Sequence, residues 1–236
     1  MREPTFKLES ELCESFIEAA TLQGWRCYPE TAGFDILAVN AAGHQCGIEA
    51  KLKLNLKVIQ QIQPYCFSKS DGPHHRVILV PDACPEGALE ILLQHAGFEI
   101  VFYIDWAKKF SGGMFSSAPM FDFNPINLCS IPEYMPDVPA GVSAPLQLTE
   151  WKIRALRVLA KLECDRVITR EDFRNIGIDM RRWISADQWL IPNGNGLWVR
   201  GVQCPKFDQQ HPTVYAVILQ EFMSSKNAIT DDEVTV

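Results

Sequence analysis

Residues 33–52, GFDILAVNAAGHQCGIEAKL, decide the fold that this sequence predicts. FDILAV at 34–39 and CGIEAKL at 46–52 are short apolar runs of the kind that form buried strands. Between them, NAAG at 40–43 supplies the Asn and Gly residues that favour a tight turn. The stretch therefore predicts a β-hairpin.

Helices and further strands are expected on both sides of this hairpin. Residues 7–23 place apolar side chains at helical spacing and end at Gly24, which predicts a helix before a short strand at 25–28. Beyond the hairpin we expect two helices and two strands, at 54–65 and 85–95 and at 76–80 and 98–104. The order of these elements predicts an α/β fold in which helices flank one mixed sheet.

The C-terminal part of the chain predicts a separate, smaller domain. Residues 111–146 are rich in Gly, Pro and Ser, so we expect a linker there, which could wrap on the first domain. Thr169 and Asp172 form a capping-box signature. Helices are expected at 149–164, 170–176 and 178–189, and a hairpin around NGNG in 190–201. Three helices and a hairpin are the order of a small winged helix-turn-helix domain.

These patterns set the expected domain boundaries. They are 1–110 for the α/β domain, 111–146 for the linker, 147–224 for the winged-helix-like domain and 225–236 for a flexible tail. The chain of 236 residues is 47% hydrophobic, which is enough apolar surface to order a core domain and a small second one.

The sequence shows no membrane-spanning or secretory segment. Its longest apolar runs are far shorter than the roughly 20 residues of a membrane span. The start of the chain, MREPTFKLES, lacks the apolar core of a secretory signal. We therefore expect a cytoplasmic protein without a membrane partner.

Several classes of chemistry lack their signatures. The eight cysteines include no CxxC pair and stand mostly in apolar surroundings, so we expect reduced core thiols and no thiol nucleophile. His74 and His75 lie in a polar loop without a third ligand at fixed spacing, which argues against a metal role. There is also no P-loop, no G-x-S-x-G and no G-x-G-x-x-G.

Charge is distributed unevenly along the chain. The net charge of -7 and the pI of about 5.3 argue at first against a nucleic-acid partner. Residues 1–149 carry this whole excess, with 10 Lys and Arg against 17 Asp and Glu, whereas 152–182 hold nine basic residues against five acidic ones. The acidic part could hold a metal ion, and the basic stretch could contact phosphates.

Three charged residues in the hairpin carry the chemistry. Glu49 and Lys51 are two residues apart on one strand and share a face, and the hairpin brings Asp35 beside them. Charges within apolar strands are costly to bury unless they pair or bind a metal. Two carboxylates suit Mg²⁺, and a lysine can orient or deprotonate a metal-bound water. The alternative is a solvated, half-exposed face of the hairpin.

Gly33-Phe34-Asp35, a hairpin and Ile48-Glu49-Ala50-Lys51 resemble the metal-binding core of the PD-(D/E)XK nuclease superfamily, which has the restriction-endonuclease-like fold. The resemblance covers about residues 7–105. It implies that Asp35 and Glu49, together with the Ala50 carbonyl, bind Mg²⁺, with Mn²⁺ as a substitute. It also implies that Lys51 is catalytic.

Two further matches extend the resemblance. The family often places a glutamate on the helix before the first strand, for which Glu11 is the better candidate and Glu14 the other. It would help to hold a second ion or a metal-bound water. A Q-xxx-Y motif on the next helix matches Gln61 and Tyr65, where the glutamine would position the lysine or a phosphate and the tyrosine would contact DNA. Both residues also fit an ordinary helical turn with a core tyrosine.

DNA contacts are expected from the second domain. Arg181 and Arg182 on its third helix could enter a major groove, and Arg200 on the wing could contact the backbone. Many winged helices instead join proteins together. The tryptophans of this domain are expected in its core, namely Trp151, Trp183, Trp189 and Trp198.

The resemblance and the basic stretch together imply Mg²⁺-dependent hydrolysis of DNA phosphodiester bonds, with the winged-helix domain binding the DNA. A hypothesis of a different class is a catalytically inactive DNA-binding or regulatory protein that keeps the nuclease fold as a scaffold. RNA cleavage is a third hypothesis. A homodimer is compatible with the sequence, which does not distinguish an endonuclease from an exonuclease.

Overall fold

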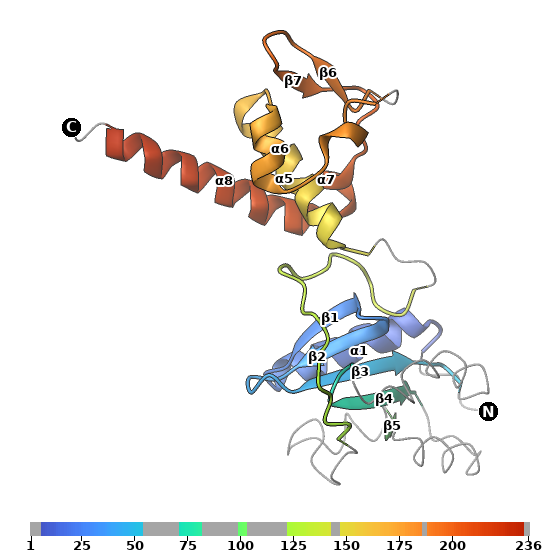
Figure 1. Ribbon diagram of the computed structural model, residues 1–236. Helices are drawn as coiled ribbons and strands as arrows, with labels where there is room; N and C mark the ends of the chain where they lie inside the picture. The colour runs from blue at the N-terminus through green and yellow to red at the C-terminus, as the bar shows by residue number, and fades with distance from the viewer. Residues whose placement is uncertain are drawn as a thin grey trace. The chain divides into compact units, whose positions relative to one another are not determined.

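The computed structural model describes residues 6–53, 71–81, 99–102, 122–142, 147–185 and 188–233 (Figure 1). The chain divides into two compact units. Unit 1 consists of Met1–Glu133 and Val138–Gln147, and unit 2 of Tyr134–Asp137 and Leu148–Val236. The expected linker is therefore shared between both units, because Tyr134–Asp137 belong to unit 2 and Val138–Gln147 to unit 1.

Unit 1 is built on the expected mixed sheet. Helix α1, Glu9–Leu22, is followed by five strands in the spatial order β1-β2-β3-β4-β5. Their bounds are β1 Arg26–Thr31, β2 Phe34–Val39, β3 Gln45–Ala50, β4 His75–Val80 and β5 Glu99–Phe102. β1, β2 and β3 pair antiparallel, whereas β3, β4 and β5 pair parallel. The helices expected at 54–65 and 85–95 lie outside the described residues.

Two tight turns define the first three strands. Ala32 and Gly33 both have positive φ, 57° and 84°, as a two-residue type I′ hairpin turn requires. The second turn follows the expected NAAG stretch, where Asn40 Oδ1 accepts hydrogen bonds from the backbone N–H groups of Ala42 and His44. The predicted hairpin over 33–52 is thus confirmed.

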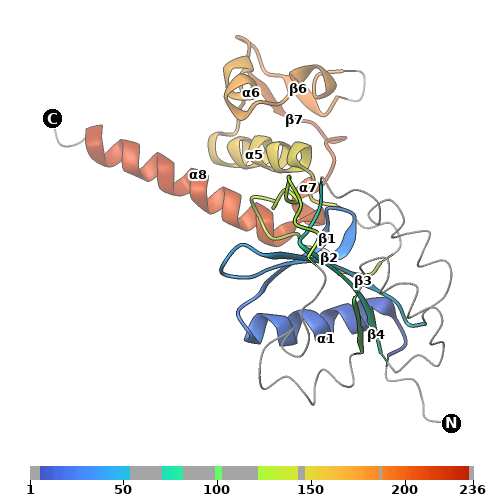
Figure 2. The ribbon, with the colours of Figure 1, turned by 60° about the horizontal axis from the view of Figure 1, so that its bottom comes forward.

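Each face of the sheet is covered. Helix α1 lies along one face of the sheet (Figure 2). The apolar residues of α1 that recur at helical spacing pack on alternate residues of the strands, Leu12, Cys13, Phe16 and Ala20 against Ile36, Ala38, Ile48, Ala50, Val77 and Leu79. On the other face, Cys129 packs against Tyr28, Leu37 and Val39. This alternation explains how a six-residue strand can be buried on both faces.

Unit 2 contains four α-helices, one 3₁₀ helix and a hairpin among its described residues. In chain order these are α5 Glu150–Asp165, α6 Arg170–Ile176, η1 Met180–Arg182, β6 Leu190–Pro192, β7 Trp198–Arg200, α7 Phe207–Gln210 and α8 Pro212–Glu233. The capping box is confirmed, because Thr169 Oγ1 accepts from the Asp172 N–H and Asp172 Oδ2 accepts from the Thr169 N–H. The hairpin around NGNG is confirmed by the antiparallel pairing of β6 and β7.

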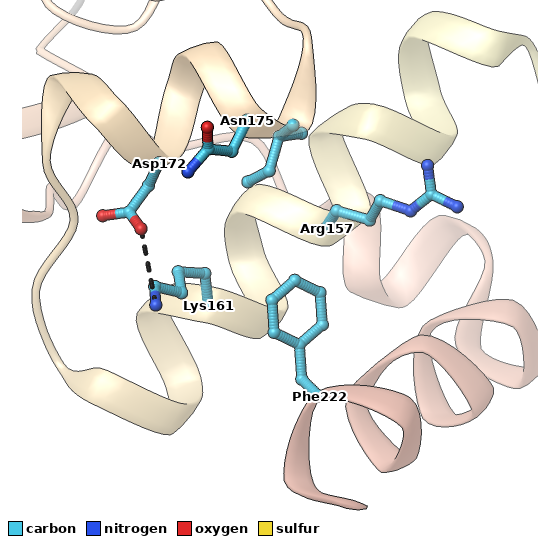
Figure 3. A pocket seen from close by; sticks show the side chains of 6 residues that line it. Arg157, Lys161, Asp172, Asn175 and Phe222 are labelled. Carbon is cyan, nitrogen blue, oxygen red and sulfur yellow. Dashed lines mark ion pairs between the residues drawn. The ribbon is translucent and has the colours of Figure 1, made fainter. Parts of the chain in front are cut away.

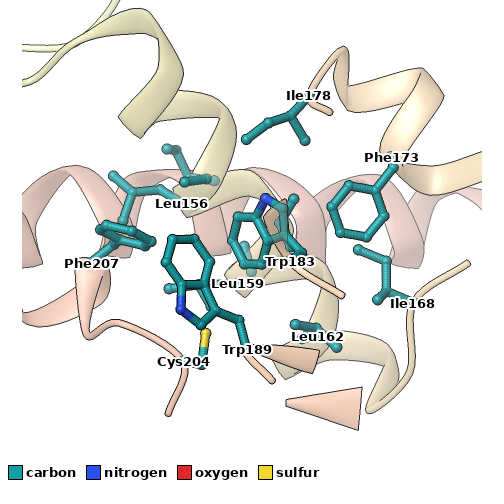
Figure 4. Close-up of a cluster of buried hydrophobic side chains, with 14 of the residues drawn as sticks. Leu156, Leu159, Leu162, Ile168, Phe173, Ile178, Trp183, Trp189, Cys204 and Phe207 are labelled. Atoms are coloured by element: carbon teal, nitrogen blue, oxygen red, sulfur yellow. The ribbon is translucent and has the colours of Figure 1, made fainter. Parts of the chain in front are cut away.

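The core of unit 2 is centred on Trp183, which is fully buried (Figure 4). Its ring makes edge-on contacts with Phe173 and Trp189, at centroid distances of 5.7 and 5.6 Å. Such contacts are favoured by the ring quadrupoles. Trp189 and Trp198 are also buried and Trp151 packs against the cluster, as expected from the sequence.

The helix expected at 178–189 is wrong. Over the described residues of this range, 178–185 and 188–189, the structure has the single 3₁₀ turn η1, and the Leu190 N–H donates to the Trp183 carbonyl at 2.9 Å. Trp183 and Trp189 both enter the core, but they are six residues apart, and a continuous helix would turn their side chains about 120° away from each other. Burial of two indoles therefore overrides the local helical pattern.

The flexible tail expected from 225 is also wrong over most of its length. Helix α8 continues to Glu233. The segment from Met223 to Glu233 contains no Gly or Pro, so nothing in it ends a helix that unit 2 has already nucleated. No helix in the described ranges has the length and apolar content that crossing a membrane requires.

Candidate functional site

The predicted acid pair lies at one end of the β2–β3 hairpin. The register pairs Ile36 with Ile48, so the next position along places Asp35 opposite Glu49. Lys51 directly follows β3, and its N–H donates to the Leu79 carbonyl at 2.8 Å, which continues the pairing with β4. Because side chains alternate along a strand, Glu49 and Lys51 emerge on the same face.

The Lys51 ammonium is surrounded by carboxylates. Lys51 Nζ lies 3.0 Å from Glu49 Oε1, 3.2 Å from Glu9 Oε2 and 3.8 Å from Asp35 Oδ2. The exposed fraction of the side chain is 12% for Lys51 and Glu49, 15% for Asp35 and 34% for Glu9. These groups therefore do not form the solvated face that was the alternative. They form a mostly buried cluster with two negative charges in excess.

Glu9 is the residue of this cluster that the sequence analysis missed. It precedes the buried Leu12 and Cys13 by three and four positions, so it lies on the face of α1 that packs on the sheet. Glu11 lies on a different face and is exposed, and its Oε2 accepts from the backbone N–H groups of Lys7 and Leu8 at 2.7 and 3.3 Å. Glu11 thus caps the helix and does not pair with Lys51. Glu14 is exposed as well.

The backbone of Ala50 holds Asp35 in place. The Ala50 N–H donates to Asp35 Oδ2 at 2.7 Å. In a strand, the N–H and C=O groups of one residue point toward the same edge, so the Ala50 carbonyl also faces β2. Carboxylates of Asp35 and Glu49 and the carbonyl of Ala50 are hard oxygen donors of the kind that Mg²⁺ prefers.

Burial sets the ionisation of the cluster. Burial raises the pKa of Asp35, against the opposing effects of the Ala50 N–H and of Lys51. Burial and then repulsion by Asp35 raise the pKa of Glu49. Burial alone would lower the pKa of Lys51, but the attraction of Asp35 and Glu49 outweighs it and raises the pKa. The lysine is therefore a protonated donor near neutral pH, while burial disfavours the charged forms of the two acids.

A fourth acid, Glu30, lies beside the cluster. Glu30 lies across from Asp35 in the β1–β2 register, and its Oε1 accepts from the N–H groups of Gly141 and Val142 at 2.8 and 3.3 Å. Gly141 has φ of 71°, and a Cβ there would come within 2.9 Å of Cys13 Sγ. Only glycine fits this approach without displacing a neighbour. The segment around Gly141 therefore packs closely against the first turn of α1.

Cys13 is a buried thiol next to the site. Burial, followed by repulsion from Asp35 and Glu30, raises the pKa of the Cys13 thiol far above neutral pH. A thiol that stays protonated is unreactive. The described cysteines are all unpaired, as expected for reduced core residues.

No ready-made metal cage is present in the part of the chain that the structure describes. There, no group of three or more His, Cys, Asp or Glu side chains is arranged to hold a metal ion. At the candidate site, the Lys51 ammonium lies between the carboxylates. His44 joins His74 and His75 in a cluster with ring centroids 4.8 to 6.5 Å apart, but His74 Nδ1 accepts from the Gln45 N–H.

The arginines predicted to contact DNA each have a partner inside unit 2. Arg181 forms a bidentate pair with Asp179, and Arg200 Nη2 lies 3.1 Å from Asp208 Oδ1. The Arg182 guanidinium lies over the rings of Trp151 and Trp189, at 5.3 and 5.2 Å from their centroids. Arg181 lines a surface hollow of unit 2 together with other basic residues. Arg182 and Arg200 do not line this hollow. Gln61 and Tyr65 lie outside the described residues.

Comparisons with known proteins are sparse. No protein-family model and no curated protein matches this chain. Among solved structures, the crystal structure of a repair endonuclease from Pyrococcus abyssi matches 43% of this chain at 20% identity, with a TM-score of 0.33. The chain spans about half the length of that protein, since the match covers 49% of it. A likeness of this size shows neither fold nor activity, so function depends on the site itself.

Proposed function

We propose that unit 1 is a Mg²⁺-dependent nuclease domain that hydrolyses DNA phosphodiester bonds. One observation carries the proposal: Lys51, Asp35 and Glu49 meet in a mostly buried cluster at the end of the β2–β3 hairpin. Such a cluster is costly to maintain, and acids with raised pKa values that gather in one place are typical of functional sites.

The charge of the cluster favours a divalent cation. Lys51 compensates only one of the three carboxylates that surround it. Asp35, Glu49 and the Ala50 carbonyl would hold Mg²⁺, which fits oxygen donors and retains several waters. When bound, the ion would polarise the scissile phosphate and lower the pKa of a water molecule.

The residues of the chain then have separable roles. Lys51, whose pKa is raised, donates hydrogen bonds and does not accept a proton, so it would orient the nucleophile and offset charge on the phosphate. Glu9 would hold the Lys51 ammonium from the side of α1. This differs from the role expected of the helix glutamate Glu11, which was to help hold a second ion or a metal-bound water. The Ala50 N–H would keep Asp35 oriented.

A second function fits one specific observation. Lys51 Nζ already lies between the carboxylates, so the cluster can be a permanent structural ion-pair network. The protein would then be a catalytically inactive DNA-binding or regulatory protein. Calorimetric titration separates the two functions, because a nuclease should bind Mg²⁺ or Mn²⁺ in a manner that Asp35→Asn abolishes, whereas the inactive scaffold should show no such binding.

Cleavage is the decisive test. Plasmid, linear and branched DNA and an RNA of matched length are incubated with Mg²⁺ and with wild type, Lys51→Ala or Glu18→Gln. Glu18 is exposed on α1 and serves as the matched control. We expect DNA products with wild type and with the control variant, and none with Lys51→Ala. Equal activity of wild type and Lys51→Ala would refute the proposal.

A further inference from the structure

A surface hollow of about 350 Å³ lies where α6 meets η1 in unit 2. It combines a basic rim with an apolar floor and is formed by one continuous stretch of chain. Its lining residues are Arg170, Phe173, Arg174, Ile178, Asp179, Met180, Arg181 and Ile184.

The rim of the hollow carries available positive charge. Arg170 and Arg174 are four residues apart on α6, so both guanidinium groups project from the same face of the helix. Neither forms an ion pair with any residue that the structure describes, and Arg170 lies 5.8 Å from the Trp198 ring centroid. Arg181 is held by Asp179, but this pair is 89% and 55% exposed, and such surface pairs are weak and exchangeable.

The floor of the hollow is apolar. Phe173 and Ile178 are buried beneath it, whereas Ile184 is 38% exposed at its edge. A ligand in this hollow would therefore contact cationic side chains at the rim and apolar side chains at the floor. A sugar–phosphate backbone has this pattern, because its charged phosphates are separated by the largely apolar faces of the sugars.

A second hollow in unit 2 also has basic and apolar lining residues, Arg157, Lys161, Ile176 and Phe222, but it includes the carboxylate of Asp172. It measures about 410 Å³ and lies between α5, α6 and α8 (Figure 3). Lys161 at its edge pairs with Asp165 at 2.8 Å and with Asp172 at 3.4 Å, so its charge is already compensated. An anion gains less there than beside Arg170 and Arg174.

We infer that the hollow between α6 and η1 binds the sugar–phosphate backbone of DNA. Arg170 and Arg174 contact phosphates through their forked guanidinium groups, which match phosphate oxygens, and Ile184 packs on a sugar. This inference rests on the proposed function for the identity of the nucleic acid, but it does not require cleavage. It replaces Arg182 and Arg200 as the principal DNA contacts by two arginines on α6.

Salt dependence of binding by the full chain tests the arginines. Anisotropy of a short fluorescein-labelled DNA duplex is measured over a range of salt in EDTA, where metal-dependent cleavage cannot occur. Each lost phosphate contact reduces the slope of log K against log salt by about 0.9, so Arg170→Gln/Arg174→Gln should reduce it by about 2. The control Arg166→Gln/Lys226→Gln removes two charges from exposed positions elsewhere in unit 2 and should leave the slope unchanged.

The apolar floor has its own readout. Ile184→Ala should weaken binding several-fold at every salt concentration without changing the slope, because it removes no charge. Val217→Ala truncates an aliphatic side chain of similar exposure on α8 and should have no effect. Tryptophan fluorescence reports whether the core around Trp183 is intact in each variant.

Three outcomes overturn the inference: wild-type slope and affinity for Arg170→Gln/Arg174→Gln, no DNA binding by the wild type, or displacement of the duplex by poly-L-glutamate as readily as by unlabelled DNA. The last result would indicate an acidic protein partner instead. Failure of the proposed function looks different. DNA binding that depends on Arg170 and Arg174 without any cleavage would end the nuclease proposal and support this inference.

Discussion

Replacing Lys51 with alanine should destabilise unit 1 by about 3–5 kcal/mol at neutral pH without divalent ions, the usual cost of removing one partner from a buried ion pair. Lys51 Nζ lies 3.0 Å from Glu49 and 3.8 Å from Asp35, and these side chains are at most 15% exposed. Without the ammonium, two buried carboxylates repel each other. The Glu9 contact contributes less, because solvent screens a side chain that is one-third exposed.

The size of this loss should depend on pH in one direction. Burial raises the pKa of Asp35 and of Glu49 in the folded chain, and Lys51 opposes both increases. An acid whose pKa is higher in the folded state binds protons on folding, so stability falls as the pH rises above the unfolded value of about 4. Lys51→Ala increases this difference in pKa. The deficit of the variant should therefore be largest near neutral pH and shrink toward pH 4.

Hydrogen exchange measures this effect locally. The chain consists of two compact units, so a global unfolding midpoint would not isolate the stability of unit 1. Exchange of the β2 and β3 amides, corrected for intrinsic rates, reports the opening free energy of the hairpin itself. Lys53→Ala removes an exposed lysine two residues away and is the matched control. Unchanged protection in Lys51→Ala at neutral pH, or a deficit that grows toward acid pH, would show that the carboxylates do not depend on Lys51.

Three further predictions concern the same site. Lys51→Ala should bind Mg²⁺ more tightly than wild type while losing cleavage, because no ammonium competes for the carboxylates; calorimetry checks this, and weaker binding would contradict it. Glu9→Gln should reduce the cleavage rate at least ~10-fold in a gel assay. Glu11→Gln should leave the cleavage rate unchanged and cost roughly 0.5–1 kcal/mol of helix stability, which thermal unfolding would measure. Gly141→Ala should destabilise unit 1 by about 1–2 kcal/mol or more, because both the left-handed backbone conformation and the nearby Cys13 Sγ disfavour a Cβ at this position. Hydrogen exchange in α1 at the wild-type rate would contradict this prediction.

The hairpin and its charged triad could be predicted because they depend on local rules. A period of two along the strand places Glu49 and Lys51 on one face, and a four-residue turn fixes which residue lies opposite. No knowledge of the rest of the chain is needed for Asp35 to meet them. The identity of the helix glutamate required one more rule, the spacing of Glu9 to the buried Leu12 and Cys13, which the sequence also contains.

Other features depend on contacts that no local pattern encodes. Segment 134–142 has a linker-like composition, yet Glu30 binds the N–H groups of Gly141 and Val142, and Asp137 accepts from the Val214 N–H at the start of α8. These contacts join residues 77 to 112 positions apart. Likewise, the helical pattern around Trp183 does not predict the structure, because the Trp183 indole is fully buried in a core that a continuous helix would not allow.

The excess negative charge of the cluster around Lys51 bears on both candidate functions, the nuclease and the inactive DNA-binding protein. Three carboxylates around one ammonium leave two negative charges that the folded chain must neutralise. In a purely structural network, the raised pKa values of Asp35 and Glu49 favour neutralisation by proton uptake. A divalent cation held by Asp35 and Glu49 would supply the same two charges, and Lys51 would then be able to donate to a phosphate. Protons released when Mg²⁺ is added are therefore the quantity that connects the geometry to function, because only a site that exchanges protons for the ion releases them.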